Sequence, residues 1–415
     1  MPKLVKISLL ALSVTLVLTI FLGVNSRGVR AATVQEGDGA YRQINVYSEV
    51  LRHIQTDYVE EPNIHLVTDG ALRGLLESLD ADSSYITPAA YKIYKADQKG
   101  KAQVGLNVSK RNGYAIVVSV VPGSPADKAN LNDGDWIEAI GPVDTGDLSL
   151  AMIQMLLSGQ PGSEVTLSIV NPRRGLKPQK VVLTRSMPSF PPVGETMYEN
   201  STILYLKPVI LDREHVGQIE AKLRAMPRAG NKKILLDLRD VAAGDMSEAT
   251  RLANFLLKDG TIATLEGQKV QKQVFTADAS KAIQTSAPVV VLVNRGTAGP
   301  AELVAAALAD NHRADLVGEK TFGEGAQQKT FELPDGAALI LSVAKYESPS
   351  GKRLQDDGVT PGILVAGKNA ADDASDDEDA PPATDKPAST TAAKSSVTVD
   401  EQLSKALEVL KSKAA

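Results

Sequence analysis

Residues 289–309 read VVVLVNRGTAGPAELVAAALA, and this stretch decides the fold class of the largest part of the chain. The unbroken apolar run at 289–293 is typical of a strand that is buried on both faces. A helix-like pattern follows at 301–309, after a short connection that contains two glycines. The same order occurs at 234–238 and 247–257. The sequence therefore predicts an α/β layer domain over residues 187–367.

The residues before this domain change their apolar period. Residues 41–100 carry apolar side chains at helical spacing, which predicts a helical N-terminal segment. Residues 101–186 alternate in strand fashion and contain the hairpin pair Asn112-Gly113, which predicts a small, mostly β domain with two short helices. The whole chain is therefore expected to be a multidomain protein of mixed α/β (α+β) class.

The N-terminal residues 1–32 carry information on location. Lys3 and Lys6 precede an uncharged apolar run at 7–24, which is typical of an export signal or of a membrane anchor. Val29-Arg30-Ala31 is a passable cleavage site, but the nearby Arg27 and Arg30 weaken it, so a retained anchor is slightly favoured over cleavage. We expect an exported protein on the periplasmic or cell-envelope side, held at the cytoplasmic (inner) membrane through residues 7–24.

The C-terminal residues fall into two parts. Residues 368–396 contain almost no large apolar side chain, which predicts a disordered acidic linker. Residues 397–415 are expected to form a helix that Thr398 caps, with leucines along one face.

Composition excludes several classes of function. The chain has 45 basic and 50 acidic residues, and outside an acidic run at 372–379 its net charge is close to zero, so no nucleic-acid partner is expected. There is no cysteine, which excludes disulfides, thiolate zinc sites and cysteine catalysis. We expect neither a metal nor a cofactor. The few histidines are predicted to be surface or helix-face residues, and they are His53, His65, His215 and His312.

The motifs PGSPADKA at 122–129 and LNDGDWI at 131–137 resemble the PDZ domain of bacterial proteases. That resemblance implies a groove in which a loop and strand bind a peptide's terminal carboxylate and the peptide adds as an extra strand beside a helix. The loop and strand residues would be Val104, Gly105, Leu106, Asn107 and Val108. The helix would contribute Met152, Met155 and Leu156, for which plain core packing is an equal alternative.

Five further motifs, in this order, resemble the carboxyl-terminal processing (tail-specific) serine peptidases over roughly residues 41–367. They are LDADSSY at 79–85, VLVNRG at 291–296 continuing to Glu302, LVGEKTFG at 316–323, LPDG at 333–336 and SPSG at 348–351. The resemblance implies a serine nucleophile activated by a lysine, together with backbone N–H donors for the oxyanion.

Both residues of that catalytic dyad are substituted. The position of the family serine is Gly299, and the position of the family lysine is Glu324, whereas the glutamine that follows the lysine is present as Gln328. The turn that supplies an oxyanion donor in the family contains Ala243 and only one remaining glycine, Gly244. Pro300 has no N–H and removes the donor next to the nucleophile position.

The sequence therefore favours a catalytically impaired pseudo-peptidase that binds extended polypeptides or their C-termini in the cell envelope. It would present them to, or regulate, an active peptidase relative or adaptor. A second hypothesis is an active serine-type endopeptidase with a non-standard dyad, formed by Thr297 and Lys320, or with Glu324 as a base for water. A third is a structural envelope protein that forms homo-oligomers through its helical arm and tail.

Overall fold

The computed structural model describes residues 37–96, 101–111, 113–172, 175–367 and 400–413. The predicted signal or anchor at 1–32, the predicted linker at 368–396 and the predicted cap Thr398 lie outside these residues. None of the helices in the described ranges combines the length and apolarity that crossing a bilayer requires. The chain divides after Gly70 into two compact units.

The predicted helical segment at 41–100 contains three helices and one strand. The helices are α2 (Gly37–Asp57), α3 (Ile64–Glu77) and α4 (Pro88–Ala96). Between α3 and α4 the chain forms strand β1 (Ser84–Ile86), whose three residues are all buried. The strand arises at the point where the helical period breaks, because β1 pairs antiparallel with a strand from the other end of the chain, β16 (Ala338–Glu347).

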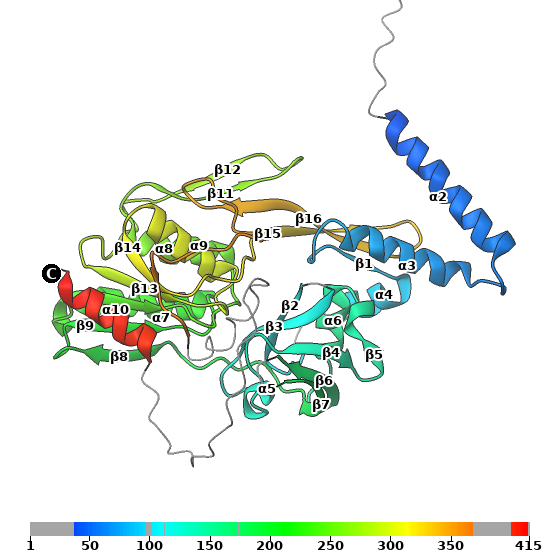
Figure 1. The fold of residues 1–415 in the computed structure, drawn as a ribbon. Coiled ribbons are helices and arrows are strands. Elements are labelled where there is room, and N and C mark those ends of the chain that lie inside the picture. Colours follow the sequence, from blue (N-terminus) through cyan, green and yellow to red (C-terminus); the bar gives the residue numbers. More distant parts are fainter. Residues whose placement is uncertain (1–36, 97–100, 112, 173–174, 368–399, 414–415) are drawn as a thin grey trace, which may run out of the picture. The chain divides into compact units, whose positions relative to one another are not determined.

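Residues 101–186 form a small β domain with two short α-helices (Figure 1). Its main sheet has the order β2-β3-β4-β6-β7, so β2 (Leu106–Arg111) is an edge strand. The other elements are β3 (Tyr114–Val120), α5 (Pro125–Lys128), β4 (Trp136–Ile140), β5 (Val143–Asp144), the 3-10 turn η1 (Thr145–Asp147), α6 (Leu150–Leu157), β6 (Glu164–Asn171) and β7 (Gly175–Thr184). Alternate strand residues and one face of α6 fill its core.

The largest domain is built on a six-stranded sheet of order β17-β14-β13-β10-β9-β8. All neighbouring strands are parallel except β8, which is antiparallel to β9. The strands are β8 (Gly194–Tyr198), β9 (Ile203–Lys207), β10 (Lys233–Asp237), β13 (Val289–Val293), β14 (Ala314–Gly318) and β17 (Ile363–Leu364). This arrangement confirms the predicted α/β layer domain.

Helices cover both faces of this sheet (Figure 1). Val289, Val291 and Val293 of β13 share a core with helices α7 (Arg213–Ala229), α8 (Met246–Leu256) and α9 (Pro300–Asp310). Val290 and Leu292 point to the opposite face, where they share a core with helix α10 (Glu401–Ser412). Burial on both faces explains why β13 is apolar at every position.

An antiparallel sheet of order β1-β16-β11-β12 completes the described fold, and β15 also pairs with β16. Its remaining strands are β11 (Thr261–Glu266), β12 (Gln273–Thr276) and β15 (Ala326–Glu332). Because β1 is part of this sheet, the motif at 79–85 is held next to the residues that precede β15.

Hydrogen bonds from the sheet domain hold helix α10 at both ends. Its N-cap is Asp400, whose side chain accepts a hydrogen bond from the Leu403 amide at 3.0 Å, so the prediction that Thr398 caps it was wrong. Arg239 Nη1 donates to both carboxylate oxygens of Asp400 at 3.0 Å. At the other end Lys233 Nζ donates to carbonyl oxygens of the last turn, where a cation also complements the helix dipole.

His215, predicted to be a surface or helix-face residue, lies on a helix but is not exposed. It is buried at the start of α7, with its Nδ1 2.7 Å from Asp212 Oδ1 and its Nε2 3.1 Å from the carbonyl oxygen of Pro191. Asp212 is the N-cap of that helix, so the imidazole joins the cap to the preceding loop. Buried polar groups need such partners, and His215 has a structural role here.

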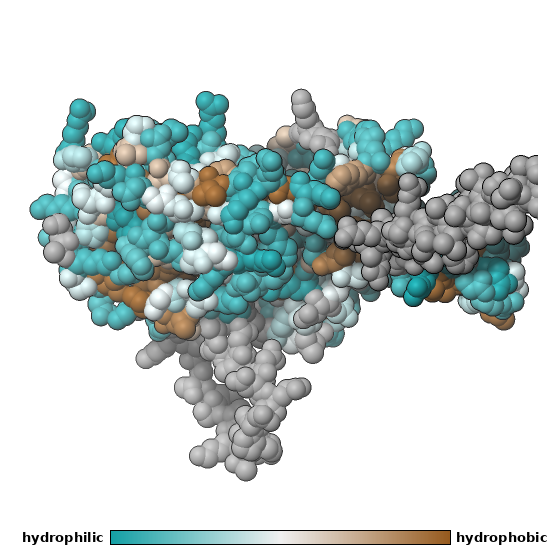
Figure 2. Space-filling model, turned by 90° about the horizontal axis from the view of Figure 1, so that it is seen from above, coloured by the Kyte–Doolittle hydropathy of each residue, from teal (hydrophilic) through white to brown (hydrophobic). Residues whose placement is uncertain are grey.

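Hydrophilic residues cover most of the face that Figure 2 shows, and apolar residues form only small patches between them.

The packing of α10 predicts a large stability effect from its buried leucine. Leu410→Ala should lower the free energy of unfolding by about 2–4 kcal/mol, because Leu410 is fully buried against the sheet. Urea unfolding followed by circular dichroism measures this. Glu408→Ala, at an exposed position of the same helix, is the control and should stay within about 0.5 kcal/mol. Equal effects of the two variants would show that the helix does not pack as described.

Candidate peptide-binding and active site

A buried carboxylate, Glu302, connects the two substituted dyad positions. It lies in the first turn of α9 and its side chain has no solvent exposure. Its Oε2 accepts hydrogen bonds from the backbone amides of Gly299 at 2.9 Å and Glu324 at 2.7 Å. Its Oε1 accepts from the amide of Gly323 at 2.8 Å and from the hydroxyl of Thr321. Gly299 and Glu324 therefore lie on either side of one oxygen atom.

Two opposing effects act on the Glu302 carboxyl. Burial raises the pKa of Glu302 to about 7, because a charge is costly where water is excluded. The hydrogen bonds from the Glu324, Gly323 and Gly299 amides and from the Thr321 hydroxyl favour the carboxylate and lower this pKa. The group needs these donors to be accommodated in the interior.

Gly299 has the backbone conformation of a strained turn. Its φ of 55° and ψ of −116° are disfavoured for residues with a side chain, and it leads directly into α9. A sharp strand-to-helix turn of this kind is how other hydrolases present a nucleophile. A Cβ at this position would meet only the carbonyl oxygen of Ala242, at 3.8 Å. The turn therefore keeps room for a side chain that the glycine does not supply.

Glu324 belongs to a group of three carboxyls with Glu302 and Asp82. Burial, together with the charges of Asp82 and Glu302, raises the pKa of Glu324 to about 8. Burial and the charge of Asp80 raise the pKa of Asp82 to about 6, although Gln355 donates to its Oδ2 at 3.0 Å. In the described part of the chain this group is not arranged to hold a metal ion.

Gln328 does not contact the Glu324 carboxyl. Its Nε2 donates to the backbone carbonyl of Asp82 at 2.7 Å, and its surface is exposed. The glutamine predicted from the family pattern thus joins β15 to the motif at 79–85.

The backbone amides beside Gly299 are already used. The Ala298 amide donates to the carbonyl of Val241 at 3.0 Å, and the Gly299 amide donates to Glu302. Pro300 is the first residue of α9 and has no N–H, and the Ala301 amide donates to the carbonyl of Ala298 at 3.2 Å. No amide from 298 to 301 is left to stabilise an oxyanion.

The turn with Ala243 and Gly244 is held by a neighbouring loop. The Leu211 amide donates to the carbonyl of Ala243 at 3.0 Å, and the Asp245 amide donates to the carbonyl of Leu211 at 2.9 Å. A Cβ on Gly244 would lie 2.5 Å from the Leu211 carbonyl oxygen, so only glycine fits where the turn lies against this loop. On the other side of the turn, the carbonyl oxygen of Ala242 faces the space at Gly299. A carbonyl oxygen repels an oxyanion.

Thr297 and Lys320 do not form a second dyad. The Thr297 hydroxyl is fully buried and donates to the carbonyl of Leu238 at 2.8 Å. Lys320 is exposed, whereas a catalytic lysine must lose water to become neutral.

A cavity of about 330 Å³ lies between β2 and α6, where the resemblance to PDZ domains places the peptide groove. Val104, Leu106, Asn107 and Val108 line it together with Met155, and Ala242 and Glu324 of the larger domain line it too. Gly105 lies within the same segment and accepts a hydrogen bond from the Val121 amide at 2.9 Å. The peptide groove and the substituted dyad position therefore share one cavity.

Two predicted groove residues are not among the side chains that line this cavity. Met152 and Leu156 pack against the core of the β domain, and Met152 also contacts the cluster around β1 and α4. Of the three predicted helix residues, only Met155 faces the groove.

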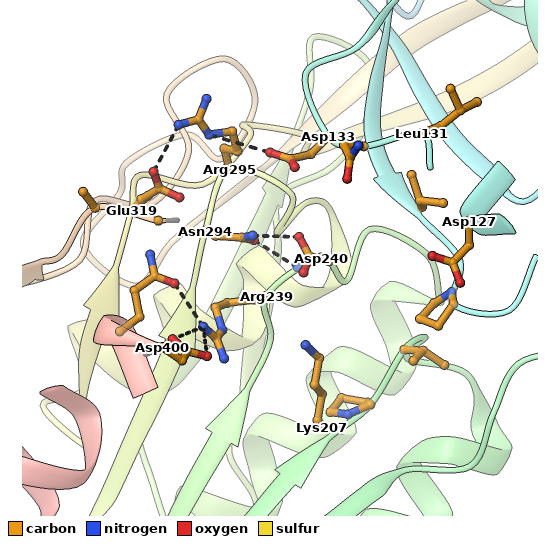
Figure 3. A pocket seen from close by; sticks show the side chains of 18 of the residues that line it. Asp127, Leu131, Asp133, Lys207, Arg239, Asp240, Asn294, Arg295, Glu319 and Asp400 are labelled. Atoms are coloured by element: carbon orange, nitrogen blue, oxygen red, sulfur yellow. Dashed lines mark hydrogen bonds and ion pairs between the residues drawn. The ribbon is translucent and has the colours of Figure 1, made fainter. Parts of the chain in front are cut away.

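A second cavity, of about 990 Å³, lies between the β domain and the sheet domain (Figure 3). Its charged side chains pair with one another: Arg295 contacts Glu319 at 3.1 Å and Asp133 at 3.7 Å, and the Asn294 amide group donates to Asp240 at 2.7 Å. The contact of Arg295 with Asp133 connects the two domains across the cavity.

Comparison with known proteins identifies the family. Residues 203–365 match the model described as Peptidase family S41, and residues 116–171 match that of the PDZ domain. A carboxyl-terminal-processing protease of Synechocystis sp. is 32% identical over 302 residues, which cover 71% of this chain and 70% of that protein. The chain belongs to the carboxyl-terminal-processing protease family.

Other members of the carboxyl-terminal-processing family are similarly related. Carboxyl-terminal-processing peptidase 2 of Arabidopsis thaliana chloroplasts is 32% identical over 75% of this chain, and the match spans 63% of that peptidase, less than two thirds of its length. The structure of the photosystem II D1 C-terminal processing protease matches 78% of this chain and 92% of its own, with a TM-score of 0.65 and 23% identity. This similarity confirms the fold.

The sequence reasoning missed two carboxyls of this site. The sequence pattern assigned Glu302 no function beyond its place in a motif. A single carboxylate in the first turn of an otherwise apolar helix nevertheless indicates a buried helix cap. Asp82 lay in the motif at 79–85, and nothing local indicates that β1 brings it to Glu324.

Because the pKa of Glu324 is raised, we predict that the free energy of unfolding decreases as pH rises. Between about pH 4.5, the ordinary pKa, and about pH 8, the Glu324 carboxyl is protonated in the folded state and ionised in the unfolded state. The free energy of unfolding therefore decreases as pH rises through that window. Glu324→Gln should remove much of this slope and stabilise the protein at pH 8 by on the order of 2 kcal/mol. Urea unfolding at pH 5, 6, 7 and 8 measures it. Glu408→Gln, on the exposed face of α10, is the matched control, and parallel curves for the two variants would contradict the burial of Glu324.

Proposed function

We propose that this family member is an exported pseudo-peptidase that binds polypeptide C-termini and does not hydrolyse them. The observation that carries the proposal is the pair Gly299 and Glu324, held on one oxygen of Glu302 where the family places its serine and lysine. Neither residue supplies a nucleophile, and the amides next to Gly299 are engaged in other hydrogen bonds. A peptide bond entering this site would meet no attacking group, and residues 298–301 would offer it no oxyanion donor.

The retained function in this proposal is binding. Strand β2 is an edge strand beside α6, and the cavity between them has the shape that strand addition requires. The relatives' names describe the processing of carboxyl termini, which supports a chain end as the ligand. The bound polypeptide would then be presented to an active relative or an adaptor.

We also propose that residues 7–24 hold the protein at the cytoplasmic membrane, facing the cell envelope. The charged start and apolar run support this location.

We expect the protein to show no proteolysis. The full chain should neither degrade casein nor react with serine-directed fluorophosphonate probes, because residue 299 has no hydroxyl. Gel electrophoresis and probe fluorescence measure the two outcomes. Thr297→Ala is the matched variant: turnover that persists through repurification and is lost in this variant would establish the alternative dyad.

Peptide binding should depend on a free carboxylate. Peptides that end in an apolar residue should bind at the 104–107 loop, and amidation of the terminus should weaken binding about tenfold or more, because a charge-assisted hydrogen bond worth roughly 1.5–3 kcal/mol is lost. Titration calorimetry measures the difference. Acetylation of the other end of the peptide is the control and should change affinity less than twofold. Equal affinity of the acid and amide forms would reject this mode of binding.

A further inference from the structure

One end of the peptide groove carries a carboxyl that has no function in the binding described above. Glu324 is the one acidic residue among those that line the cavity, and the other lining side chains are apolar or neutral except Lys101. The aliphatic lining comes from the β domain, whereas Glu324 and Ala242 come from the sheet domain. A peptide in the groove would therefore meet two chemically different walls.

Carboxyls outnumber basic groups around Glu324, because Lys101 is the one basic side chain among the residues that line the cavity. Asp82 and Glu302 act on Glu324 as like charges. In the described ranges, no side chain donates a hydrogen bond to the Glu324 carboxyl, and the donors to Glu302 are the Gly299 amide and groups of the 321–324 loop, none of which is basic. Lys345 lies near Asp82 but its Nζ pairs with Asp356 at 3.4 Å. A cation from outside would relieve this repulsion.

There is also space for a side chain at this end. Gly299 has no side chain, and a Cβ placed there would meet only the Ala242 carbonyl oxygen within 4 Å. That oxygen is an additional acceptor for an ammonium or guanidinium group. The approach to Glu324 thus offers negative charge and a carbonyl acceptor beside an apolar wall, which suits the long stem and charged head of lysine or arginine.

We propose that the groove selects peptides in which a lysine or arginine lies a few residues before the free C-terminus, with its cationic group paired to Glu324. The inference rests on the proposed binding function and names its ligand class. The basic side chain of the ligand would bring a positive charge to the position where the family carries its own lysine.

Pairing would be coupled to proton release. Burial and the neighbouring carboxyls raise the pKa of Glu324 to about 8, so at pH 7 most molecules carry a proton there before binding. A cation favours the carboxylate form, so the proton passes to the buffer as the ion pair forms. Asp82 and Glu302, whose pKa values are about 6 and 7, gain negative charge as pH rises toward 8. The positive charge of Lys101, which lines the same cavity, partly offsets this negative charge.

The test compares lysine with norleucine, which keeps the aliphatic stem and lacks the amine. Octapeptides of alanine and serine that end in leucine carry one or the other at each of the four positions before the terminus. We expect lysine to bind at least tenfold more tightly than norleucine at one or two adjacent positions at pH 8, and this preference to shrink several-fold at pH 6. Titration calorimetry with the full chain gives the affinities.

Two variants and a second readout locate the effect. Glu324→Gln should abolish the lysine preference and leave the norleucine affinity within twofold, whereas Glu408→Gln should leave both unchanged. Calorimetry at pH 7 in phosphate and in Tris, which differ in ionisation enthalpy, should show close to one proton released with the lysine peptide and none with norleucine. A merely structural role of Glu324 would not produce this difference.

The outcomes separate the inference from the function on which it rests. Equal binding of lysine and norleucine at every position overturns the inference and leaves the binding function intact. A lysine preference that survives in Glu324→Gln also overturns it, because the amine would then bind elsewhere. If none of the peptides binds, the proposed function itself fails.

Discussion

The buried carboxylate of Glu302 is the interaction on which the rest of the site depends. It gathers three backbone amides and one hydroxyl from two loops that are far apart in sequence. Without it these donors would lie unsatisfied in the interior, where each costs about 1–3 kcal/mol. The start of α9 and the loop at 321–324 are therefore held together independently of which residues occupy positions 299 and 324.

This independence explains how the dyad positions differ from the family pattern while the frame around them remains. Glycine relaxes a backbone conformation that is strained for residues with a side chain, so Gly299 suits the turn without needing a function. Glu324, at the position that the resemblance assigns to the family lysine, adds a partly buried carboxyl to the buried Asp82 and Glu302. In the function proposed here, such a site would attract cations instead of activating a nucleophile.

The two domains contribute different parts of a single cavity. The β domain supplies an edge strand and an apolar helix face, and the sheet domain supplies the polar end with Glu324 and Ala242. The contacts of Arg295 with Asp133 and Glu319 connect the domains across a separate polar cavity. Binding chemistry in this protein thus depends on the pairing of two domains, each of which folds around its own core.

Local sequence patterns determined the layers, the buried strand β13, the small β domain and the substitutions at 299 and 324, because periodicity and residue identity are local properties. Sequence could not reveal that Met152 and Leu156 face the core, that His215 is buried, or that Asp400 caps α10 and binds Arg239. These positions and contacts depend on which helices and strands pack against one another in the tertiary structure. Asp82 reaches Glu324 only because β1 pairs with β16, a contact between residues more than 250 positions apart. Tertiary structure alone decides the charge environment of a site, because electrostatic interactions act through space between residues that are distant in the sequence.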